Sequence, residues 1–590
     1  TILKLMNARD RAYKPGKSRK TNPTWKFLSS LVKRLMRKRK REYVAHKLNK
    51  ATSSKAWWKS VRDIEGKQQE KISNHHLIDN QWISTPEFVS RLNEYFVTVG
   101  GDRDMSARPS VLPQALQPVS IGQVKLLLKK IDTTKANNSD DFPSWISKAA
   151  AEDVCVPVTN IINAMLASNK YPSAWKKAEI RPLKKVKNPD RLSQYRPISL
   201  LHHIGKVAEE IIPNKLRNAI GEKLNKNQYA YQKQLSTTDA LLHAVHDWCQ
   251  DLDDNTTSHI TTALIDMSKA FDRLNPNIII SKLTELNVNS GLVTLIDDFL
   301  SNRQCRVKLR EHSAYRDITM GTPQGTKLGP WLWLVYINEL SVPSSCRVIK
   351  YADDLTLYAK FKKSDQSTAS NFQHALNSIS DWALNNNMLI NAEKTQIVHL
   401  SLSEPKYIPS FTMNGKQLQS TSNAKLLGVT IDAKLSFSKH IQDTCEGLAG
   451  RMYGMRELKR LGLNSQGLTL YYTANIRSVL TYACPVWGSL ITDKDKETIR
   501  RIEGKAMRII NSDISYEQAL CQYQVPAVDQ FIADLSRKTM LKIYSNTNHP
   551  LSCVIKRKTT RQTRVSKMIQ MPKCRTEKLK RSFFHHYSDF

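Results

Sequence analysis

The sequence is short of negative charge and has no long hydrophobic runs. It contains 53 Asp and Glu against 90 Lys and Arg, which gives a formal net charge of +37 over 590 residues. No run of 18 or more apolar residues occurs, so the sequence predicts no membrane-spanning helix. So large a positive surplus implies a polyanionic partner, and nucleic acid fits better than a membrane surface.

Paired cysteines are also lacking. The count is odd, no two cysteines share a metal-ligand spacing, and Cys574 with His585 and His586 does not make a zinc knuckle. We therefore expect reduced thiols in a nuclear or cytoplasmic protein that is not secreted. The sequence has neither an initiator Met nor a signal peptide, so we expect a fragment of a longer reading frame or a processed product. The cysteines are residues 155, 249, 305, 346, 445, 484, 521, 553 and 574.

A pair of adjacent carboxylates stands out in the stretch from Arg347 to Lys360. Two β-prone runs, Val348 to Tyr351 and Leu355 to Tyr358, flank Asp353 and Asp354, as in a hairpin with acids at its turn. Adjacent like charges repel, so a divalent cation with oxygen ligands is the simplest reason to hold both ionised. An exposed turn is the alternative, because Asp is common in turns.

A second strand supplies another acid. An apolar, β-branched run from Thr261 ends at Asp266, and Phe271 follows five residues later. Two-metal phosphoryl transfer needs carboxylates from separate elements to hold two cations roughly 4 Å apart. Asp266 and Asp353 meet this need if their strands pair.

A series of motifs occurs in fixed order over most of the chain. The motifs are Trp175–Ala178, Tyr195–Leu201, Leu235–Leu241, Asp266–Asp272, Gly321–Gly325 with Leu328–Pro330, Tyr351–Asp354, Asn391–Thr395 and Leu426–Asp432. With these motifs the chain resembles the reverse transcriptase of a non-LTR, LINE-type, jockey-like retrotransposon.

The resemblance implies an α+β, right-hand polymerase fold with fingers, an antiparallel-sheet palm and a helical thumb, preceded by a basic helical extension. The expected domains are the extension at 1–100, a linker at 101–119, a helical pre-fingers region at 120–164, fingers and palm at 165–434, a thumb at 435–520 and a basic tail at 521–590. Within this plan we expect a capping box at Ser120 and Gln123, a buried helix from Trp331 to Ile337, and a strand from Leu426 to Ile431 beside the primer.

The resemblance also implies a catalytic centre. Asp266, Asp353 and Asp354 are the expected catalytic carboxylates, and Lys394 is the expected general acid toward the pyrophosphate leaving group, although a surface lysine fits nearly as well. The expected cofactor is a pair of Mg²⁺ ions, with Mn²⁺ as a substitute. The expected metal ligands are Asp266, Met267, Asp353 and Asp354.

Contacts to the incoming nucleotide are expected from fingers and palm. Phe271 would clash with a 2′-hydroxyl and so select deoxynucleotides, although the spacing alone favours a core aromatic. One departure stands out: Gln232 lies where the family usually has an Arg, which leaves Lys233 as a point charge without the bidentate fork. The expected nucleotide-binding residues are Arg196, Lys233, Phe271, Gln324 and Gly325.

Two basic helices are the expected contacts to nucleic acid. The first follows Trp25, and the second, in the thumb, has Ile499 and Ala506 on its packed face. A solvated face or a nuclear-localisation signal is the alternative for the first. The expected contact residues are Lys33, Arg34, Arg37, Lys38 and Arg39 in the first helix and Arg501, Lys505 and Arg508 in the second.

The sequence therefore predicts an RNA-directed DNA polymerase that extends a DNA primer on an RNA template with deoxynucleoside triphosphates, in a nuclear or cytoplasmic ribonucleoprotein. A catalytically impaired, RNA-binding remnant of such an element is the first alternative, since Gln232 replaces the expected Arg. An RNA-directed RNA polymerase is the second, and Phe271 fits it less well. No oligomeric state is indicated.

Overall fold

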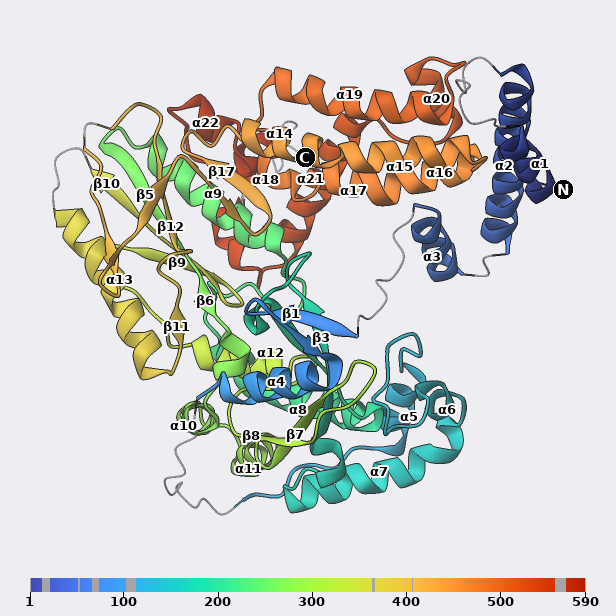
Figure 1. The fold of residues 1–590 in the computed structure, drawn as a ribbon. Coiled ribbons are helices and arrows are strands. Elements are labelled where there is room, and N and C mark those ends of the chain that lie inside the picture. The colour runs from blue at the N-terminus through green and yellow to red at the C-terminus, as the bar shows by residue number, and fades with distance from the viewer. Residues whose placement is uncertain are drawn as a thin grey trace. The chain divides into compact units, whose positions relative to one another are not determined.

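A computed structural model describes residues 2–12, 22–50, 53–65, 74–101, 113–362, 367–405, 407–557 and 569–588. The chain divides into two compact units, one formed by residues 71–427 and the other by residues 1–70 with 428–590. Together their elements confirm the predicted mixture of helix and sheet (Figure 1). Among the described residues, no helix is long and apolar enough to cross a membrane.

A five-stranded sheet forms the centre of unit 71–427. Its order is β15-β12-β5-β10-β9, and every neighbouring pair is antiparallel except β12 and β15. The central strand β5 is almost wholly buried because it has neighbours on both edges and helices on both faces. The bounds are β5 Thr257–Ile265, β9 Arg347–Tyr351, β10 Asp354–Lys362, β12 Gln396–Leu400 and β15 Gln419–Thr421.

Helices cover both faces of this sheet, and the alternation along β10 explains why. Leu355, Leu357, Ala359 and Phe361 point to one face, where they join the core with α13 (Ser367–Asn385). The residues between them point to the other face, which packs against α9 (Thr237–Asp253). There the ring of Tyr358 meets that of Trp248 at 6.0 Å between centroids.

The predicted hairpin with acids at its turn is confirmed. β9 pairs with β10 so that Tyr351 lies opposite Asp354, and Ala352 and Asp353 form the turn. Ala352 has a φ of 54°, and its N–H donates to Gln228 Oε1 at 3.3 Å. The predicted pairing of the two acid-bearing strands is also confirmed, since Leu355 lies opposite Ile265.

A buried lysine supports the same hairpin from behind. The Lys350 side chain is completely buried in β9, and its Nζ donates to the carbonyl oxygens of Ile337 and Leu340 at 3.1 and 2.6 Å. Ile337 is the last residue of α12 (Gly329–Ile337), the predicted buried helix, and Leu340 lies three residues beyond it. The last carbonyls of a helix have no partner within it, so Lys350 supplies one. Burial lowers the pKa of Lys350 to about 7.

A four-stranded sheet of order β4-β3-β7-β8 forms the second layer of this unit. Helix α4 (Thr85–Thr98) packs on it through Phe88, Val89 and Leu92, together with the β1-β2 hairpin. Residues 75–98 therefore belong to the packing of this sheet, although the sequence placed them in the N-terminal extension. The strands are β1 His75–Ile78, β2 Gln81–Ser84, β3 Lys177–Lys184, β4 Tyr195–Leu200, β7 Arg303–Val307 and β8 Arg316–Ile318.

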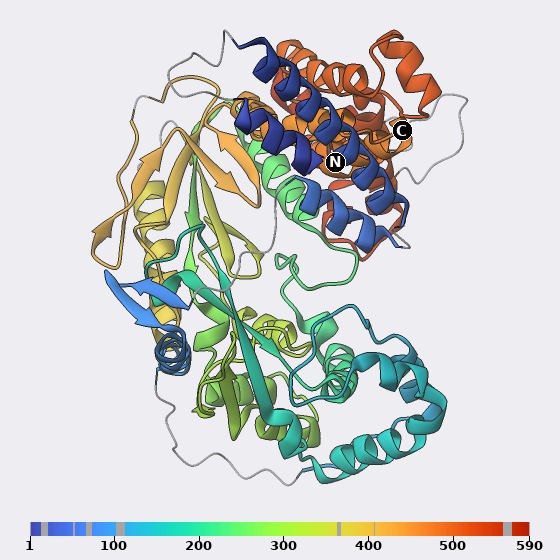
Figure 2. The same cartoon turned by 45° about the vertical axis from the view of Figure 1, so that its right-hand side comes forward.

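Further helices complete unit 71–427, and Figure 2 shows α5, α6 and α7 grouped together. The predicted capping box of α5 is confirmed, since Ser120 and Gln123 bond each other's backbone reciprocally. The remaining elements are α5 Ile121–Lys129, α6 Ser144–Ala149, α7 Ala151–Ser168, α8 His203–Ile220, β6 Met267–Ser268, α10 Pro276–Glu285, α11 Ser290–Leu300, β11 Leu389–Ile390, β13 Thr412–Met413, β14 Lys416–Gln417 and β16 Asn423–Leu426.

The predicted single strand from Leu426 to Ile431 is wrong. β16 ends at Leu426 and β17 (Val429–Asp432) begins three residues later. Between them, Leu427 and Gly428 have φ values of 45° and 88°, which turn the chain. The apolar run concealed this turn because Leu is rare at positive φ.

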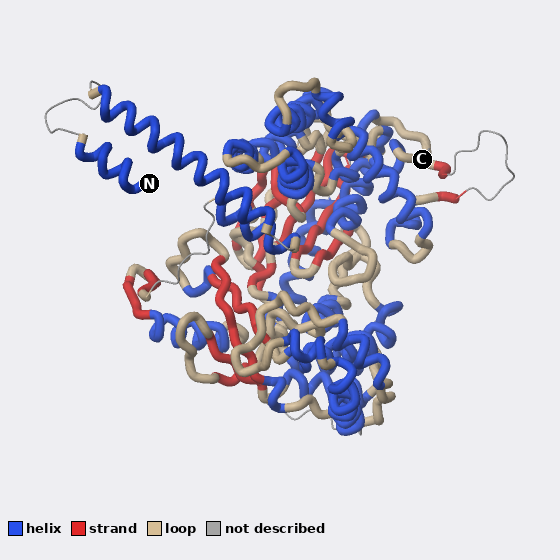
Figure 3. Tube along the Cα trace, turned by 90° about the vertical axis from the view of Figure 1, so that its right-hand side faces the viewer, coloured by secondary structure: helices blue, strands red, loops and turns tan. Residues whose placement is uncertain are grey.

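Unit 1–70 with 428–590 is mainly helical, as Figure 3 shows in blue. Its core contains the carboxylate of Glu503, which accepts from Tyr472 Oη at 2.7 Å, Arg477 Nη2 at 3.1 Å and the Val528 N–H at 2.8 Å. One buried acid thus joins three helical segments. The elements are α14 Ser438–Gly447, α15 Ala449–Arg460, α16 Ser465–Tyr471, a π-helical turn Tyr472–Arg477, α17 Ser478–Leu480, α18 Cys484–Trp487, α19 Asp493–Ile510, α20 Tyr516–Gln522 and α21 Val528–Ser545.

Both ends of the sequence pack into this unit. Tyr471 Oη donates to Glu65 Oε1 at 2.6 Å, and the Trp58 ring lies 6.1 Å from the Tyr471 ring. Near the C-terminus, Phe583 and Phe584 are buried, so the stretch expected to be a basic tail contributes to the core. The elements are α1 Ile2–Arg11, α2 Pro23–Asn49, α3 Ser54–Ile64, β18 Lys556–Arg557, β19 Ile569–Gln570, α22 Glu577–Lys580 and α23 Phe583–His586.

Candidate active site

A cavity of about 960 Å³ opens between the two sheets of unit 71–427. Most of the residues expected at the catalytic centre line it. The expected residues in its wall are Arg196, Asp266, Met267, Phe271, Gln324, Gly325, Asp353 and Lys394. Residues more than 150 positions apart in sequence therefore share one site.

Asp266 is positioned by its own backbone. Its N–H donates to Thr395 Oγ1 at 3.4 Å, and its carbonyl accepts from the Asn391 N–H at 2.8 Å. These bonds fix the loop from Asn391 to Thr395 against the end of β5. As a result Lys394 lies in the same cavity wall as Asp266, and its charge opposes the rise that burial causes in the pKa of Asp266.

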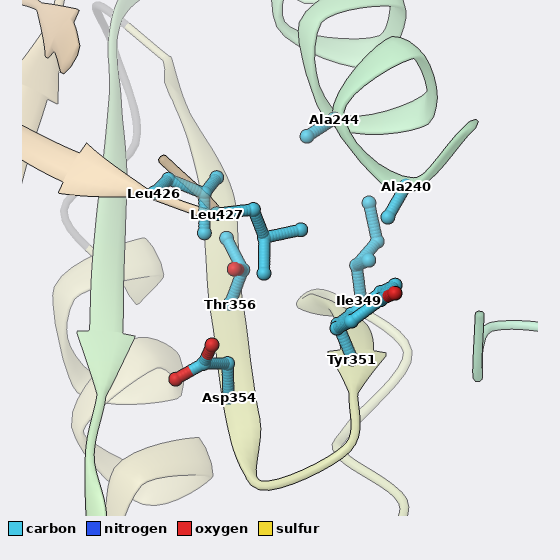
Figure 4. Close-up of a pocket in the computed structure, with 8 residues that line it drawn as sticks. All are labelled: Ala240, Ala244, Ile349, Tyr351, Asp354, Thr356, Leu426 and Leu427. Atoms are coloured by element: carbon cyan, nitrogen blue, oxygen red, sulfur yellow. The ribbon is translucent and has the colours of Figure 1, made fainter. Parts of the chain in front are cut away.

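The two neighbouring acids of the hairpin face different surroundings. Asp353, in the turn, lines the large cavity with Asp266. Asp354, the first residue of β10, lines a small pocket with Thr356, Tyr351 and Leu427 (Figure 4). Period-two alternation in a strand accounts for the difference, since successive side chains point in opposite directions.

The three carboxylates affect one another's protonation. Partial burial, followed by the charges of Asp353 and Asp266, raises the pKa of Asp354 to about 6. Burial is also the main cause of the raised pKa of Asp353, and the charge of Asp266 adds to it. These carboxylates repel one another, and a hard divalent cation bound to their oxygens would relieve that repulsion. Among the described residues, the one His, Cys, Asp or Glu trio with ligand atoms all within 4.8 Å is Asp141, His202 and His203, outside this cavity.

Phe271 lies in the cavity wall rather than wholly in the core. Its ring contacts Tyr231 edge-on at 6.2 Å and Trp333 at 5.7 Å between centroids. The Phe271 carbonyl accepts from the Thr322 N–H at 3.0 Å, which joins the aromatic to the glycine-rich turn. A ring fixed on two sides can act as a steric limit at the surface of the cavity.

The turn from Gly321 to Gly325 approaches other backbone closely. A Cβ at Gly321 would lie 2.6 Å from the Asp272 carbonyl oxygen, and its φ is 78°. Gln324 Nε2 donates to Asp272 Oδ1 at 2.8 Å. The amide expected to contact nucleotide or template is therefore held by a carboxylate that the sequence analysis did not select.

Further cations line the same cavity as the acids. Arg196 lies on β4, and Lys185 just after β3 donates from Nζ to the Ser193 carbonyl at 2.9 Å. Lys269, which sequence reasoning missed, also lines the cavity and lies 4.4 Å above the ring of Tyr95. Burial lowers the pKa values of Lys185 and Lys269, and the charge of Asp272 opposes both shifts.

The departure at Gln232 has a clear structural setting. The Gln232 side chain donates to the Gln228 carbonyl and does not line the cavity. Lys233 is exposed and lies outside the cavity as well. Tyr231 lines the cavity, with its pKa raised to about 12 by burial and by the charge of Asp353. Its φ of 60° gave no signal in the sequence.

The residues expected to contact nucleic acid are all exposed. This holds for Lys33, Arg34, Arg37, Lys38 and Arg39 on α2 and for Arg501, Lys505 and Arg508 on α19. Arg39 pairs with Glu42 at 3.2 Å and Arg501 with Glu497 at 3.2 Å. Exposed pairs of this kind contribute little, so both helices present cationic faces.

Comparison with known proteins identifies part of the chain. Residues 183–431 match the family described as reverse transcriptase (RNA-dependent DNA polymerase). The chain is 26% identical to the RNA-directed DNA polymerase from mobile element jockey of Drosophila melanogaster over 463 residues, which is 75% of this chain and 49% of that protein. It is also 26% identical to a probable RNA-directed DNA polymerase from transposon BS of the same species, over 69% of this chain and 46% of that protein.

The chain thus spans about half the length of the curated relatives it matches. Among solved structures, it is similar to a telomerase from Candida tropicalis in complex with a fragment of telomeric RNA. The TM-score is 0.33 at 12% sequence identity, and the similarity covers 62% of this chain and 64% of the telomerase chain.

Proposed function

On the premise that residues 183–431 belong to the reverse transcriptase family, we propose that this chain extends a DNA primer on an RNA template. The relatives by sequence are RNA-directed DNA polymerases of mobile elements, and the fold is that of a right-hand polymerase. In this fold the five-stranded sheet is the palm, the four-stranded sheet belongs to the fingers, and the helices after residue 434 are the thumb.

One observation carries the proposal. Strands β5 and β10 pair directly, and the acids at their ends, Asp266 and Asp353, line the same cavity. A structural role for both acids does not account for this, because core carboxylates are normally neutralised by hydrogen bonds or ion pairs. No ion pair joins either acid to a cation within the described part of the chain. Two anionic oxygen donors facing one cavity are suited to phosphoryl transfer.

Each acidic residue has a proposed role. Asp266 and Asp353 would hold two Mg²⁺ ions, with the backbone carbonyl oxygen of Met267 as a further ligand. Asp354, which lines the neighbouring pocket, would support them through its charge. When bound, the ions activate the primer 3′-hydroxyl and stabilise charge on the leaving phosphates. Lys394 supplies a proton to the leaving pyrophosphate, since its loop is fixed beside Asp266.

The cationic wall is proposed to bind the nucleotide triphosphate. Lys185 and Arg196 offer charge-assisted hydrogen bonds to its phosphates. Phe271 limits the space beside the sugar, and Gln324, oriented by Asp272, contacts the nucleotide or the template along with the backbone at Gly325. Template and primer are bound along the exposed basic faces of α2 and α19, in a nuclear or cytoplasmic ribonucleoprotein.

Primer extension by the purified chain tests this function. The substrate is a DNA primer annealed to an RNA template, supplied with deoxynucleoside triphosphates and Mg²⁺. We expect full-length DNA with Mg²⁺ and none with EDTA. If the protein binds the RNA but forms no product at saturating nucleotide in Mg²⁺ or Mn²⁺, the chain is an RNA-binding remnant instead.

A further inference from the structure

A second cavity, of about 230 Å³, lies in unit 71–427 and shares no lining residue with the proposed active site. One wall is the face of α8 that carries His203, Lys206, Val207 and Glu210, spaced as on one side of a helix. The other walls are the end of α5 with the loop that follows it, and Lys327.

Positive side chains dominate this cavity. Lys130, Lys135, Lys206 and Lys327 line it, against two acids, Asp132 and Glu210. Lys327 pairs with Glu210. Asp132 Oδ1 already accepts from the N–H and the hydroxyl of Thr134 at 3.0 and 2.7 Å. Within the described residues, Lys130, Lys135 and Lys206 form no ion pair; Lys130 and Lys135 are exposed and Lys206 is half-buried.

Lys206 is the most confined of the three. It lies half-buried in the wall formed by α8, and burial lowers its pKa, with the charges of Lys135 and Lys327 adding to the shift. Glu209 is the largest opposing influence. That carboxyl is itself buried, its pKa is raised by burial, and its oxygens accept from the Lys327 N–H and Tyr171 Oη. It therefore compensates Lys206 only in part.

Ammonium groups gathered around one cavity repel one another, and an anion bound among them relieves that repulsion. Asn137 and Ser144 add uncharged polar groups to the same wall. Lysine ammonium groups around a cavity of this size match the tetrahedral oxygens of a phosphate group. A carboxylate ligand fits less well, because one small planar group with two oxygens would have to contact several separate ammonium groups.

We propose that this cavity is a second phosphate-binding site, separate from the catalytic one, with Lys130, Lys135 and Lys206 as its ligands. The phosphate belongs either to the backbone of an RNA strand or to a free polyphosphate. An RNA strand would be the template before it reaches the catalytic cavity, and that assignment rests on the proposed function. The site itself rests on the charges and the cavity alone.

Lysine footprinting on the full chain tests the proposal without requiring polymerisation. The protein is acetylated with sulfo-NHS-acetate alone, with a 20-nucleotide single-stranded RNA, or with tripolyphosphate, and each lysine is followed by mass spectrometry. We expect at least a fivefold slower modification of Lys135 and Lys206 with one of the two anions. Protection by RNA alone identifies a nucleic-acid backbone, and protection by tripolyphosphate identifies a free polyphosphate site. Unchanged rates with both anions overturn the proposal.

A variant pair gives a second measurement. Lys135→Gln with Lys206→Gln should make the slope of log K against log salt for single-stranded RNA shallower by about 1.4, since each lost phosphate contact removes about 0.7. Lys170→Gln with Lys226→Gln is the matched control, because both lysines are exposed in the same unit and line neither cavity. Equal slopes in the two double variants, together with tripolyphosphate affinity unchanged from wild type in both, contradict the proposal. Neither the footprinting nor the binding measurement requires polymerisation. Failure of the second phosphate site and failure of the polymerase assignment can therefore be told apart.

Discussion

Phe271 is the residue proposed to select the sugar of the nucleotide. It contacts the rings of Tyr231 and Trp333, at 6.2 and 5.7 Å between centroids, and Phe271 lines the proposed active site. A ring packed on two sides cannot move away from an added hydroxyl without losing those contacts. Discrimination between deoxynucleotides and ribonucleotides should therefore depend on the size of the side chain at position 271.

Shrinking this ring should relax the choice of sugar. Phe271→Val removes the proposed clash, so incorporation of ribonucleotides relative to deoxynucleotides should rise about tenfold or more, measured by competing single-nucleotide extension. Trp333→Phe is the matched control, because Trp333 contacts the same ring but does not line the cavity. An unchanged ratio in a folded Phe271→Val variant would show that the residue only packs.

The cations around the cavity are the proposed contacts to the triphosphate. Lys185 is anchored by its bond to the Ser193 carbonyl, whereas Gln232 bonds the Gln228 carbonyl and is absent from the cavity wall. Nucleotide affinity should therefore depend on Lys185 more than on the replaced Arg.

Two substitutions compare these positions. Lys185→Gln should raise the KM for nucleotide about ten- to a hundredfold, the value of one charge-assisted hydrogen bond at 1.5 to 3 kcal/mol. Gln232→Arg should lower the KM by a smaller factor, because position 232 does not line the cavity. Steady-state kinetics at saturating template and primer measure both. A larger effect of Gln232→Arg would assign the triphosphate to the other side of the cavity.

At this scale the sequence predicted some residues and missed others. The placement of Asp266, Asp353 and Lys394 in one cavity followed from strand pairing and motif order. Lys269, Asp272 and Tyr231 were missed because their places depend on partners far away, such as Gln324 for Asp272. Lys233 was expected at the nucleotide, but a local turn with positive φ at Tyr231 and Gln234 leaves it outside.

Among the elements, the five-stranded sheet contains two buried histidines on neighbouring strands. His259 on β5 stacks on Phe361 at 4.6 Å, and His399 on β12 contacts Thr261 Oγ1 through Nδ1 at 3.1 Å. Burial lowers the pKa of each to about 4, and the charge of His399 contributes to the shift of His259. Both are therefore neutral in the folded sheet at pH 7.

This burial makes the sheet sensitive to acid. An unfolded histidine has a pKa near 6.5, so between pH 6.5 and 4 the unfolded chain binds more protons than the folded one. The contribution of neutral His259 and His399 to the free energy of unfolding is fully present above pH 6.5, and it is lost as the pH falls from 6.5 to 4. His259→Phe should reduce the loss at pH 4.5 by on the order of 2 kcal/mol, seen as a smaller shift of the urea midpoint between pH 7 and 4.5. His374→Gln, at an exposed histidine of α13, should shift like the wild type.

Helix α2 is the most strongly basic element described. It contains nine Lys and Arg and one acid, Glu42. Like charges three and four residues apart destabilise a helix, so the repulsion along the basic face of α2 is relieved when a polyanion binds there. Packing elsewhere holds the helix, since Val32, Val44 and Leu48 are buried.

Neutralising that face should weaken RNA binding without unfolding the unit. Replacing Arg37, Lys38, Arg39 and Lys40 by Gln should make the slope of log K against log salt shallower by about 3, at about 0.7 for each phosphate contact. Glu42→Gln is the control, because it removes the one acid of α2 and should not weaken binding. A slope equal to that of the wild type would mean that α2 presents only a solvated face.

Most long elements could be predicted from pattern, and short turns could not. The hairpin around Asp353 and the capping box at Ser120 have local signals, alternation in one case and spacing in the other. At the turn of Leu427 and Gly428 the glycine is the one local signal, and the apolar residues on both sides of it continue the pattern of a strand.

At the scale of the whole molecule, the chain groups by packing rather than by motif order. Residues 1–70 belong to the same compact unit as residues 428–590, through contacts such as Tyr471 Oη to Glu65 Oε1, which are 406 positions apart. The domain limits expected from the sequence followed motif positions. Periodicity and spacing in a sequence do not indicate contacts between residues so far apart. The grouping of residues 1–70 with residues 428–590 could therefore be seen only in the structure.

The central claim concerns the two acids that paired strands bring to one cavity, and primer extension by Asp353→Asn measures it most directly. The substitution removes an anionic metal ligand and keeps the side-chain shape, so Mg²⁺-dependent extension on an RNA template should fall below detection while RNA affinity stays within about twofold of wild type. Extension by Asp353→Asn at a rate comparable to the wild type would contradict the account.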